Sequence, residues 1–450
     1  MLVGILTFAA CQHPVDPGES TPATVPEAGG TLPVRHVADP EAAERGRRLF
    51  EAGTLFDPVL PVIGFRSLWM VWGTGPIADD DAYWAAFRER YGMLEAPYDN
   101  DGYPVGLRTQ AGNALLDCYT CHVGEVAGQV VVGVANSTFD MAGLQGDLER
   151  LAALGGIDAP AVTSGTGAVG ANDAWGLGVQ LVNDLYPDPE VNLHFGYQRP
   201  GAWWTLKYKD RMYSDGAAGA DGYRTMMAML LAYGFTPAEA ATLEPEFQDV
   251  QQFLWSLEAP AWPYDPPADD AVARGRAVFD DTCARCHGVH SGPDAAYPDR
   301  IVPLDEVGTD PVRAANFRQV EADFLNDSVS AAFGSDLLQA TGGYLAPPLV
   351  GIWARAPYFH NASVPDLAGV VDSASRPDVW ERTGSGADDY DPERVGWRYT
   401  VPADPLDAST LEGRRIHDAA REGLSNGGHP FGDALSDAER ADLLAYLVTL

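Results

Sequence analysis

Arg274-Gly-Arg-Ala-Val-Phe-Asp-Asp-Thr-Cys-Ala-Arg-Cys-His287 determines the architecture of this chain, because it ends in a Cys-x-x-Cys-His motif. Two thiols at this spacing add to the two vinyl groups of one porphyrin, and the histidine that follows becomes the proximal ligand of its iron. A second copy lies earlier, at Cys118-Tyr-Thr-Cys121-His122. The sequence therefore predicts two covalently bound haems c. Their attachment residues are Cys118, Cys121, Cys283 and Cys286, and their proximal iron ligands are His122 and His287.

Two other interpretations of the paired cysteines fit less well. One four-thiolate zinc site would leave the histidine after each pair unexplained, and the two pairs lie far apart in the sequence. A thioredoxin-like redox pair needs a strand before it and a long helix after it, and neither copy lies in such a βαβ pattern. Zinc binding and plain disulfides remain the alternatives to haem.

The charge of the chain restricts its partners. Its 450 residues are enough for two or three domains, and 64 acidic residues outnumber 29 basic ones, for a formal net charge of −35. Phosphate groups are bound by basic surfaces, so this charge argues against nucleic acid and anionic lipid as partners. A basic electron-transfer partner or a salty habitat fits this charge more easily. Among the basic residues only two are lysines, Lys207 and Lys209.

The first eleven residues form a short apolar run that ends in small residues and Cys11. An export signal with a lipid-attachment cysteine has this pattern, although the basic residues that normally open such a signal are missing. Cys11 is the only cysteine outside the haem motifs, and a free thiol would be hazardous in an oxidising compartment. We therefore expect a signal peptide at 1–11 and a periplasmic or outer-membrane/extracellular lipoprotein, whose membrane contact is the lipid anchor alone. A disordered apolar N-terminus with a stray thiol is the alternative.

An internal repeat brackets the two motifs. Glu41-Ala-Ala-Glu-Arg-Gly-Arg-Arg-Leu-Phe50 and Asp270-Ala-Val-Ala-Arg-Gly-Arg-Ala-Val-Phe279 share an opening helical pattern, and 246–257 resembles 437–450 as a closing helix. The order of opening helix, motif and closing helix resembles cytochrome c, whose first and last helices cross behind the haem. The glycine in each opening helix would permit a close crossing, or else be a weak point of the helix.

The predicted fold is therefore mainly α, with two cytochrome c-like haem domains in tandem and long loops. Residues 12–38 are poor in large apolar side chains and form a flexible tether. The first domain covers 39–262 and the second 263–450. The boundary lies in Ala259-Pro-Ala-Trp-Pro-Tyr-Asp-Pro-Pro267, where four prolines occur in nine residues.

The first domain carries a large insertion before its motif. Seventy-two positions separate Gly46 from Cys118, whereas eight separate Gly275 from Cys283. The insertion is aromatic, with Phe65, Trp69, Trp72, Tyr83, Trp84, Phe87, Tyr91, Tyr98 and Tyr103. Such residues either wall a haem pocket or form a packed core of their own, and the packed core is the commoner case.

Four segments carry a resemblance to a known family. Leu345–Leu367, with its Ala-Pro-Tyr-Phe-His-Asn stretch, Tyr390–Trp397 and Ser425–Gly432 resemble the diheme rubber oxygenases and their uncharacterised relatives, which are akin to bacterial diheme cytochrome c peroxidases. Ala202–Gly216 in the first unit resembles the oxygenase side of this superfamily. The Ala-Pro-Tyr-Phe-His-Asn stretch has a similar form in the peroxidases, so it indicates the superfamily and not one activity. The resemblance covers most of 41–450, in a chain shorter than a rubber oxygenase.

This resemblance implies roles for further residues. It makes His429 the sixth ligand of the second haem and His360 a pocket residue close to that haem. No methionine follows Met229, so the second domain cannot supply the methionine ligand of ordinary cytochromes c. For rubber oxygenases the resemblance also implies that the first haem lacks a protein ligand on its distal face and binds dioxygen there. In peroxidases that haem is where peroxide reacts, and the second haem passes in electrons.

Other candidate residues have weaker support. His194, His290 and His417 lie in no motif and are expected to be satisfied or solvated side chains. The pair Trp203-Trp204 is expected to pack, with an electron bridge between the haems as the alternative. The methionines of the apolar helical stretch 224–231 are expected to fill a core.

The leading hypothesis is an exported diheme c-type oxidoreductase that activates dioxygen or peroxide at the first haem, with the second haem as electron reservoir. Its partners would be a small-molecule oxidant, a basic redox protein, or both. The alternative belongs to another functional class: it is a plain electron-transfer cytochrome in which both irons are six-coordinate. The sequence does not distinguish oxygenase from peroxidase, and it shows no pattern for calcium, which is left open as a further cofactor.

Overall fold

A computed structural model describes most of the chain. The described residues are 32–53, 55, 60–156, 168–185, 187–219, 222–232, 235–328, 337–403 and 407–450. The predicted signal peptide, its Cys11 and most of the tether lie outside these ranges. Within the described ranges, no helix has both the length and the apolar composition that a membrane span requires.

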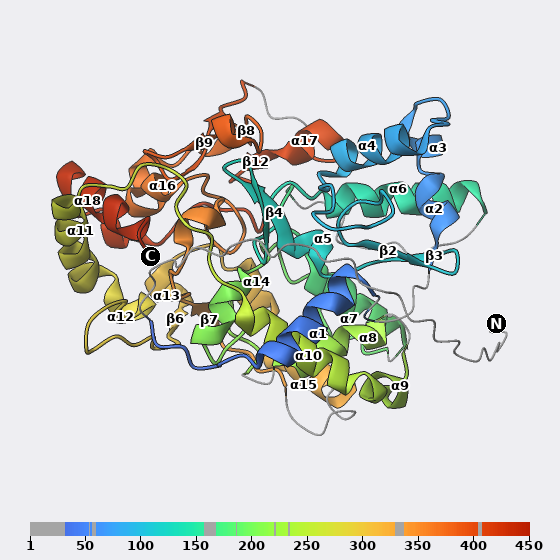
Figure 1. Cartoon of the computed structure of the whole chain (residues 1–450), viewed down its shortest axis with the longest axis horizontal. Helices are drawn as coiled ribbons and strands as arrows, with labels where there is room; N and C mark the ends of the chain where they lie inside the picture. The colour runs from blue at the N-terminus through green and yellow to red at the C-terminus, as the bar shows by residue number, and fades with distance from the viewer. Residues whose placement is uncertain are drawn as a thin grey trace.

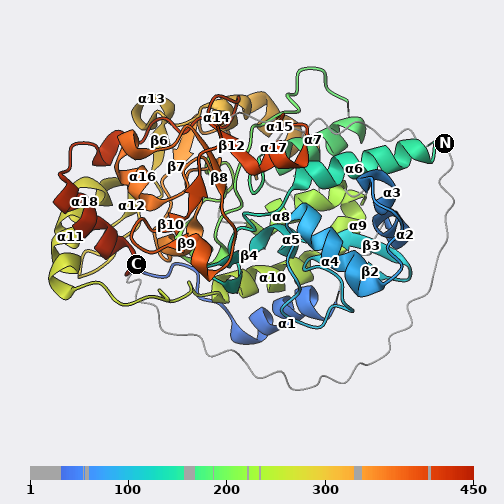
Figure 2. The same cartoon turned by 90° about the horizontal axis from the view of Figure 1, so that it is seen from above.

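Two crossing helix pairs form the frame of the molecule. α1 (Pro40–Glu51) packs across α10 (Glu244–Ser256), and α11 (Asp269–Thr282) packs across α18 (Asp437–Leu447). Figures 1 and 2 both show the α11–α18 pair at one end of the molecule and the insertion at the other. The opening and closing helices that the repeat predicts are therefore confirmed, and they pair within each unit.

The same contact fixes both crossings. A Cβ atom on Gly46 would overlap the backbone carbonyl of Asp249, and one on Gly275 would overlap that of Asp442. The arginine before each glycine then forms a two-pronged ion pair with that same aspartate. Its Nε lies 2.7 Å from a carboxylate oxygen in both Arg45–Asp249 and Arg274–Asp442. Each glycine is thus required by the close approach of two helices, and we call this repeated contact the Arg-Gly/Asp lock.

Helix ends follow the local sequence. Asp39 caps α1, its carboxylate accepting from the backbone N–H groups of Glu41 and Ala42, and Pro40 occupies the first helical position. Ser436 and Glu439 form a capping box at the start of α18. These caps satisfy the free N–H groups of the first turn, which explains why the helices begin where they do.

The insertion folds around its own aromatic core. It contains β1 (Leu60–Pro61), α2 (Val62–Arg66), α3 (Trp69–Trp72), α4 (Asp80–Tyr91), β2 (Leu107–Gln110) and β3 (Asn113–Leu116). The strands form an antiparallel sheet in the order β1-β3-β2. Helices α2, α3 and α4 contact α6 (Met141–Leu154), and Tyr83, Trp84, Phe87 and Tyr91 are buried between them. The packed-core interpretation of these aromatic residues is the one the structure supports.

The remainder of the first unit surrounds its motif. It contains α5 (Tyr119–His122), β4 (Val123–Val126), β5 (Gln129–Val132), α7 (Ala174–Leu185), η1 (Trp203–Tyr208), α8 (Gly222–Ala232) and α9 (Pro237–Thr242). Strands β4 and β5 form an antiparallel hairpin in which Val123 pairs with Val132. This hairpin directly follows the motif histidine and leads the chain back beside it.

The second unit combines short helices with short strands. Its helices are α12 (Ala284–His287), α13 (Leu304–Val307), α14 (Val312–Asn316), α15 (Gln319–Ser328), η3 (Ile352–Arg355), α16 (Leu367–Val371), η4 (Ser373–Ser375), η5 (Ala387–Asp389), α17 (Leu411–Arg415) and η6 (Pro430–Gly432). Its strands are β6 (Ile301–Pro303), β7 (Gly343–Leu345), β8 (Val379–Arg382), β9 (Tyr390–Asp391), β10 (Gly396–Trp397), β11 (Tyr399–Thr400) and β12 (Ile416–Asp418). They pair as β6-β7, β9-β10 and β11-β8-β12. The fold is mostly helical, as predicted.

The two units share their hydrophobic cores. Phe317, Ala322 and Leu325, around α15, pack with first-unit residues such as Phe247. In the other large cluster, Trp204 of the first unit packs with Trp353 and Trp397 of the second. The proline-rich segment at 259–267 thus separates two helix pairs but not two cores.

Candidate functional site

A cavity of about 660 Å³ lies between the two units, and both Cys-x-x-Cys-His motifs form part of its wall. We call 118–122 the first motif and 283–287 the second motif. Their four cysteines and two histidines all line this cavity, as do His360 and His429. The structure therefore brings together all eight residues that the sequence singled out.

One helical turn sets the geometry of each motif. Cys118 precedes α5 and Cys283 precedes α12, and each turn ends at the motif histidine. The backbone N–H of His122 donates to the carbonyl of Cys118 over 3.0 Å, and that of His287 to Cys283 over 3.0 Å. Residues three and four positions apart lie on one face of such a turn, so both thiols and the imidazole of each motif can reach one group.

The described geometry does not show the arrangements that the alternatives to haem require. All four motif cysteines are free thiols, which argues against plain disulfides. Among the residues that the structure describes, no three His, Cys, Asp or Glu side chains converge as ligands of one metal ion. The two cysteine pairs therefore do not combine into a four-thiolate zinc site.

His287 is held as an iron ligand should be. Its Nδ1–H donates to the carbonyl of Pro347 over 2.8 Å, which leaves Nε2 as the nitrogen available to a metal. Burial lowers the pKa of His287 to about 4, the Pro347 carbonyl opposes this shift, and Arg355 adds to it. The imidazole is thus neutral near pH 7, as metal ligation requires.

His429 lies across from His287. The centres of the two rings are 6.2 Å apart. An imidazole nitrogen binds a transition metal at about 2 Å and lies about 1 Å from its own ring centre, so two imidazoles on opposite sides of one metal have ring centres about 6 Å apart. The observed spacing fits an iron between them. Burial lowers the pKa of His429 to about 4, with His287 and Arg376 adding to the shift.

A fixed loop holds His429 in this place. Its backbone has φ +49°, a left-handed conformation that costs a non-glycine residue about 1–3 kcal/mol. The N–H of His429 donates to the carbonyl of Val307 over 2.6 Å. Arg376 donates to the carbonyls of Asn426 and Gly428 over 2.7 Å each. Arg376 is therefore a positioning residue for His429, and no local sequence signal identifies it.

His122 has different surroundings. Its ring stacks on Trp203, with centres 4.5 Å apart and planes 20° from parallel. Burial lowers the pKa of His122 to about 3, the Gly201 carbonyl opposes this shift, and Arg199 adds to it. Its Nδ1 makes no hydrogen bond of regular geometry within the described part of the chain, although the Gly201 carbonyl lies near it. Trp203 thus packs on the imidazole of the first motif, whereas Trp204 lies in the core and donates to the carbonyl of Val350 over 2.9 Å.

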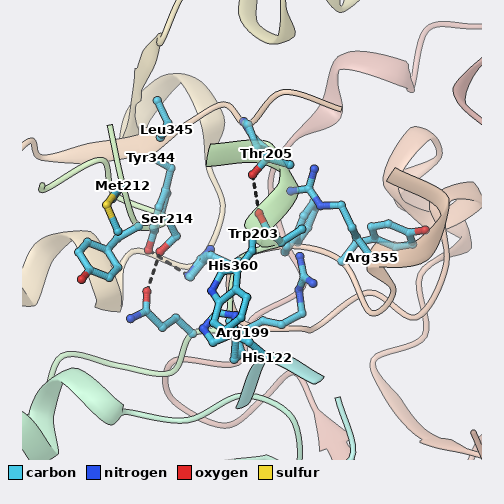
Figure 3. A pocket seen from close by; sticks show the side chains of 18 of the residues that line it. His122, Arg199, Trp203, Thr205, Met212, Ser214, Tyr344, Leu345, Arg355 and His360 are labelled. Carbon is cyan, nitrogen blue, oxygen red and sulfur yellow. Dashed lines mark hydrogen bonds between the residues drawn. The ribbon is translucent and has the colours of Figure 1, made fainter. Parts of the chain in front are cut away.

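His360 is engaged by a tyrosine. Its Nε2 lies 3.0 Å from the hydroxyl of Tyr344, and the two rings stack with centres 4.1 Å apart. Figure 3 shows His360 between Tyr344 on one side and Trp203 and Arg199 on the other. The side chain predicted to lie close to the second haem therefore faces the cavity beside residues of the first unit as well.

Three further histidines, His194, His290 and His417, are absent from the described cavity wall. Nδ1 of His194 lies 2.8 Å from a carboxylate oxygen of Asp173, which raises the pKa of this histidine. Nε2 of His417 lies 3.1 Å from the carbonyl of Leu424. His290 is buried against Phe279. His194 and His417 thus have hydrogen-bond partners, as expected for satisfied side chains, whereas neither ring nitrogen of the buried His290 makes a hydrogen bond of regular geometry to a described residue.

Two family models match segments of the chain. The model described as RoxA-like, cytochrome c-like matches residues 343–381, and the model described as cytochrome c matches residues 272–324. These two matches support a c-type cytochrome of the RoxA-like kind. The segment matched by the cytochrome c model contains most of α11 and the whole second motif, and the segment matched by the RoxA-like model contains His360. This cytochrome therefore binds haem c covalently and is a redox protein.

Curated relatives of this cytochrome occur in Sinorhizobium fredii (strain NBRC 101917 / NGR234). One is the uncharacterized protein y4iM, 34% identical over 206 residues, which covers 40% of this chain and 45% of the relative. Another is the uncharacterized protein y4iJ, 28% identical over 259 residues, which covers 43% of this chain and 41% of the relative. The matched part of the chain spans less than half the length of each relative.

Proposed function

We propose that the protein is an exported diheme c-type oxidoreductase. One haem, attached at Cys118 and Cys121, reacts with dioxygen or peroxide, and the other, attached at Cys283 and Cys286, supplies electrons. Export through the segment that ends at Cys11 belongs to this proposal. The net charge of −35 supports a basic redox protein as the electron donor, because opposite charges accelerate encounter between proteins.

The observation that carries the proposal is the asymmetry of the two motifs. His429 lies opposite His287 at the spacing of two axial ligands. The described part of the cavity wall contains four histidines, His122, His287, His360 and His429. Tyr344 engages the Nε2 of His360, and the ring that stacks on His122 is that of Trp203 and not that of a second histidine. The iron at His122 would then have a free axial position.

The wall near the first motif suits a small neutral molecule. It is built from apolar side chains, among them Leu144, Leu148, Trp175, Leu230 and Phe247. Haem supplies one-electron exchange and, at an iron with a free axial position, a place for a small oxidant. Bulky apolar side chains exclude water from that place, which favours reaction with a small molecule over simple electron transfer.

Three methionines of the first unit, Met141, Met212 and Met226, also line the cavity. A methionine sulfur can bind haem iron, so these three side chains are the ones that could occupy the free axial position at His122. The sulfur of Met212 packs directly against Gly222, where a Cβ atom would overlap it. Met93 and Met227 lie in hydrophobic cores instead, as expected for methionines that fill space.

The purified protein should contain two haems c per chain. Both motifs are complete and line one cavity, so alkaline pyridine should give a two-haem spectrum that survives acid–acetone extraction, because thioether bonds hold the porphyrin. Replacing both Cys118 and Cys121 with alanine should reduce the count to one. A single haem in the unaltered protein, or bound zinc, would contradict the diheme proposal.

Carbon monoxide should bind promptly to about half of the haem in the reduced protein, because only an iron with a free axial position takes a ligand without displacing a side chain. Rapid mixing followed by absorbance at the Soret band measures this fraction. A fully low-spin ferric spectrum with no prompt binding would instead support the alternative, an electron-transfer cytochrome with two six-coordinate irons. Spectra with and without peroxide then distinguish peroxidase from oxygenase chemistry.

A further inference from the structure

The cavity reverses the charge balance of the chain. Acidic residues outnumber basic ones by 64 to 29 over the whole sequence. In the described part of the cavity wall, however, four basic residues occur with one carboxylate, Asp117: they are Arg199, Lys209, Arg285 and Arg355. One of the two lysines in the chain is thus placed here. A site that concentrates cations in so acidic a protein is complementary to anions.

Three of these cations remain unpaired. Asp117 lies 3.7 Å from Arg108, and Arg285 lies 3.7 Å from Glu306. Within the described chain, no carboxylate lies within ion-pair distance of Arg199, Lys209 or Arg355. Asp299 acts on Lys209 from a distance, but it is engaged by Arg35. We call Arg199, Lys209 and Arg355 the cation cluster.

Arg355 is buried, and Arg199 and Lys209 are half-buried where they line the cavity. Nε and Nη1 of Arg199 and Nε of Arg355 are buried without a hydrogen-bond partner among the described residues. Arg355 is 5% exposed and donates to the carbonyl of Pro348 over 2.8 Å. Burial lowers the pKa of Lys209 to about 8, of Arg199 to about 9 and of Arg355 to about 10. Unpaired buried charge is costly, so these donors require an anionic partner.

The cation cluster also lies between the two motifs. Arg199 is close enough to His122 to lower its pKa, and Arg355 is close enough to His287 to do the same. Arg355 in turn repels Arg199 and Lys209. Figure 3 shows the side chains of Arg199 and Arg355 reaching into the same part of the cavity. The cluster therefore connects the surroundings of the two proximal histidines.

We propose that Arg199, Lys209 and Arg355 hold the propionate groups of both haems, and that the propionate edges of the two haems meet at this cluster. Each haem carries two carboxylates on an otherwise apolar ring, and the rest of the cavity wall is mainly apolar. A guanidinium group matches a carboxylate in shape and charge. This inference rests on the two-haem part of the proposed function.

A shared cation couples the two redox centres. A positive charge near an iron favours the reduced state, since reduction removes one positive charge from the metal. Arg355 lies near His287 and repels Arg199, which lies near His122. Its charge should therefore raise the reduction potentials of both haems, whereas the charge of Arg199 should act mainly on the haem at His122.

Potentiometric titration of the full-length holoprotein tests this proposal, because thioether bonds retain haem in the variants. Arg355→Met should lower the reduction potential of both haems by about 59 mV, which corresponds to an about tenfold shift of each one-electron equilibrium toward the oxidised state. Arg199→Met should shift mainly the haem at His122. Lys207→Met is the matched control: Lys207 is buried, pairs with Glu258 and is absent from the described cavity wall. It should leave both potentials unchanged.

Other outcomes overturn the proposal. Unchanged potentials in Arg199→Met and Arg355→Met proteins that retain two haems would exclude the propionate role, and so would an equal shift in Lys207→Met. If Arg355→Met does not fold, two other variants test the proposal. Lys209→Met should lower the reduction potential of at least one haem. Arg355→Lys keeps the positive charge and should leave both potentials close to those of the unaltered protein. A pyridine assay that finds one haem contradicts the diheme function, whereas two haems with unchanged potentials contradict the propionate role alone.

Discussion

Replacing His429 with alanine should convert the haem of the second motif from low spin to high spin. His429 is the ring that lies 6.2 Å from His287, and removing it leaves the iron with one strong-field ligand. Its loop is held by Arg376 and Val307, so no neighbouring side chain can easily take its place. The ferric absorbance and electron paramagnetic resonance spectra should both report the change.

A second measurement adds to this result. The fraction of reduced haem that binds carbon monoxide should rise from about half to nearly all, because both irons then have a free axial position. His417→Ala is the matched control, since His417 is a buried histidine of the same unit that stacks on Trp380 and is absent from the described cavity wall. An unchanged spectrum in the His429 variant would transfer the ligand role to His360.

Gly275→Ala should destabilise the protein strongly. The new methyl group would overlap the backbone carbonyl of Asp442, and backbone cannot rotate away as a side chain can. α11 and α18 would have to separate, and such overpacking costs about 1–3 kcal/mol or more. Chemical unfolding of the holoprotein, followed by the Soret band and by circular dichroism, measures the loss. Gly46→Ala should act in the same direction at the α1–α10 crossing.

Gly146→Ala supplies the control for this result. Gly146 lies within α6, and nothing stands within 4 Å of the position its Cβ would take. Alanine is a better helix former than glycine by about 0.5–1 kcal/mol, so this variant should be as stable as the natural protein or more stable. Equal effects of the two substitutions would mean that the Arg-Gly/Asp lock is looser than the structure shows.

The sequence was most informative where the signal is local. A Cys-x-x-Cys-His motif needs only one helical turn, and the repeated Arg-Gly-Arg pattern lies within single helices, so both could be recognised without tertiary knowledge. His429 could be selected because the second domain lacks methionine and because its segment resembles a known family. The structure confirms the opening and closing helices and places both motifs and His429 in the wall of one cavity.

What could not be predicted depends on residues far apart in the chain. Arg199, Lys209 and Arg355 lie in different segments, and each looks like an ordinary surface cation until the fold turns it inward. The packing of α15 against the first unit has no periodic signature either, because an amphipathic helix does not specify which core it covers. The predicted boundary near 262 therefore separates the two helix pairs, but it does not separate the hydrophobic cores, which the two units share.

The Arg-Gly/Asp lock has a consequence for the order of biosynthesis. Its partners are 204 positions apart in the first unit and 168 in the second, and each motif lies between them. A ribosome therefore completes the thiols of a motif long before it makes the helix that closes the unit. If attachment chemistry meets the chain at that stage, the arrival of α10 and later of α18 would close each unit over a porphyrin that is already bound.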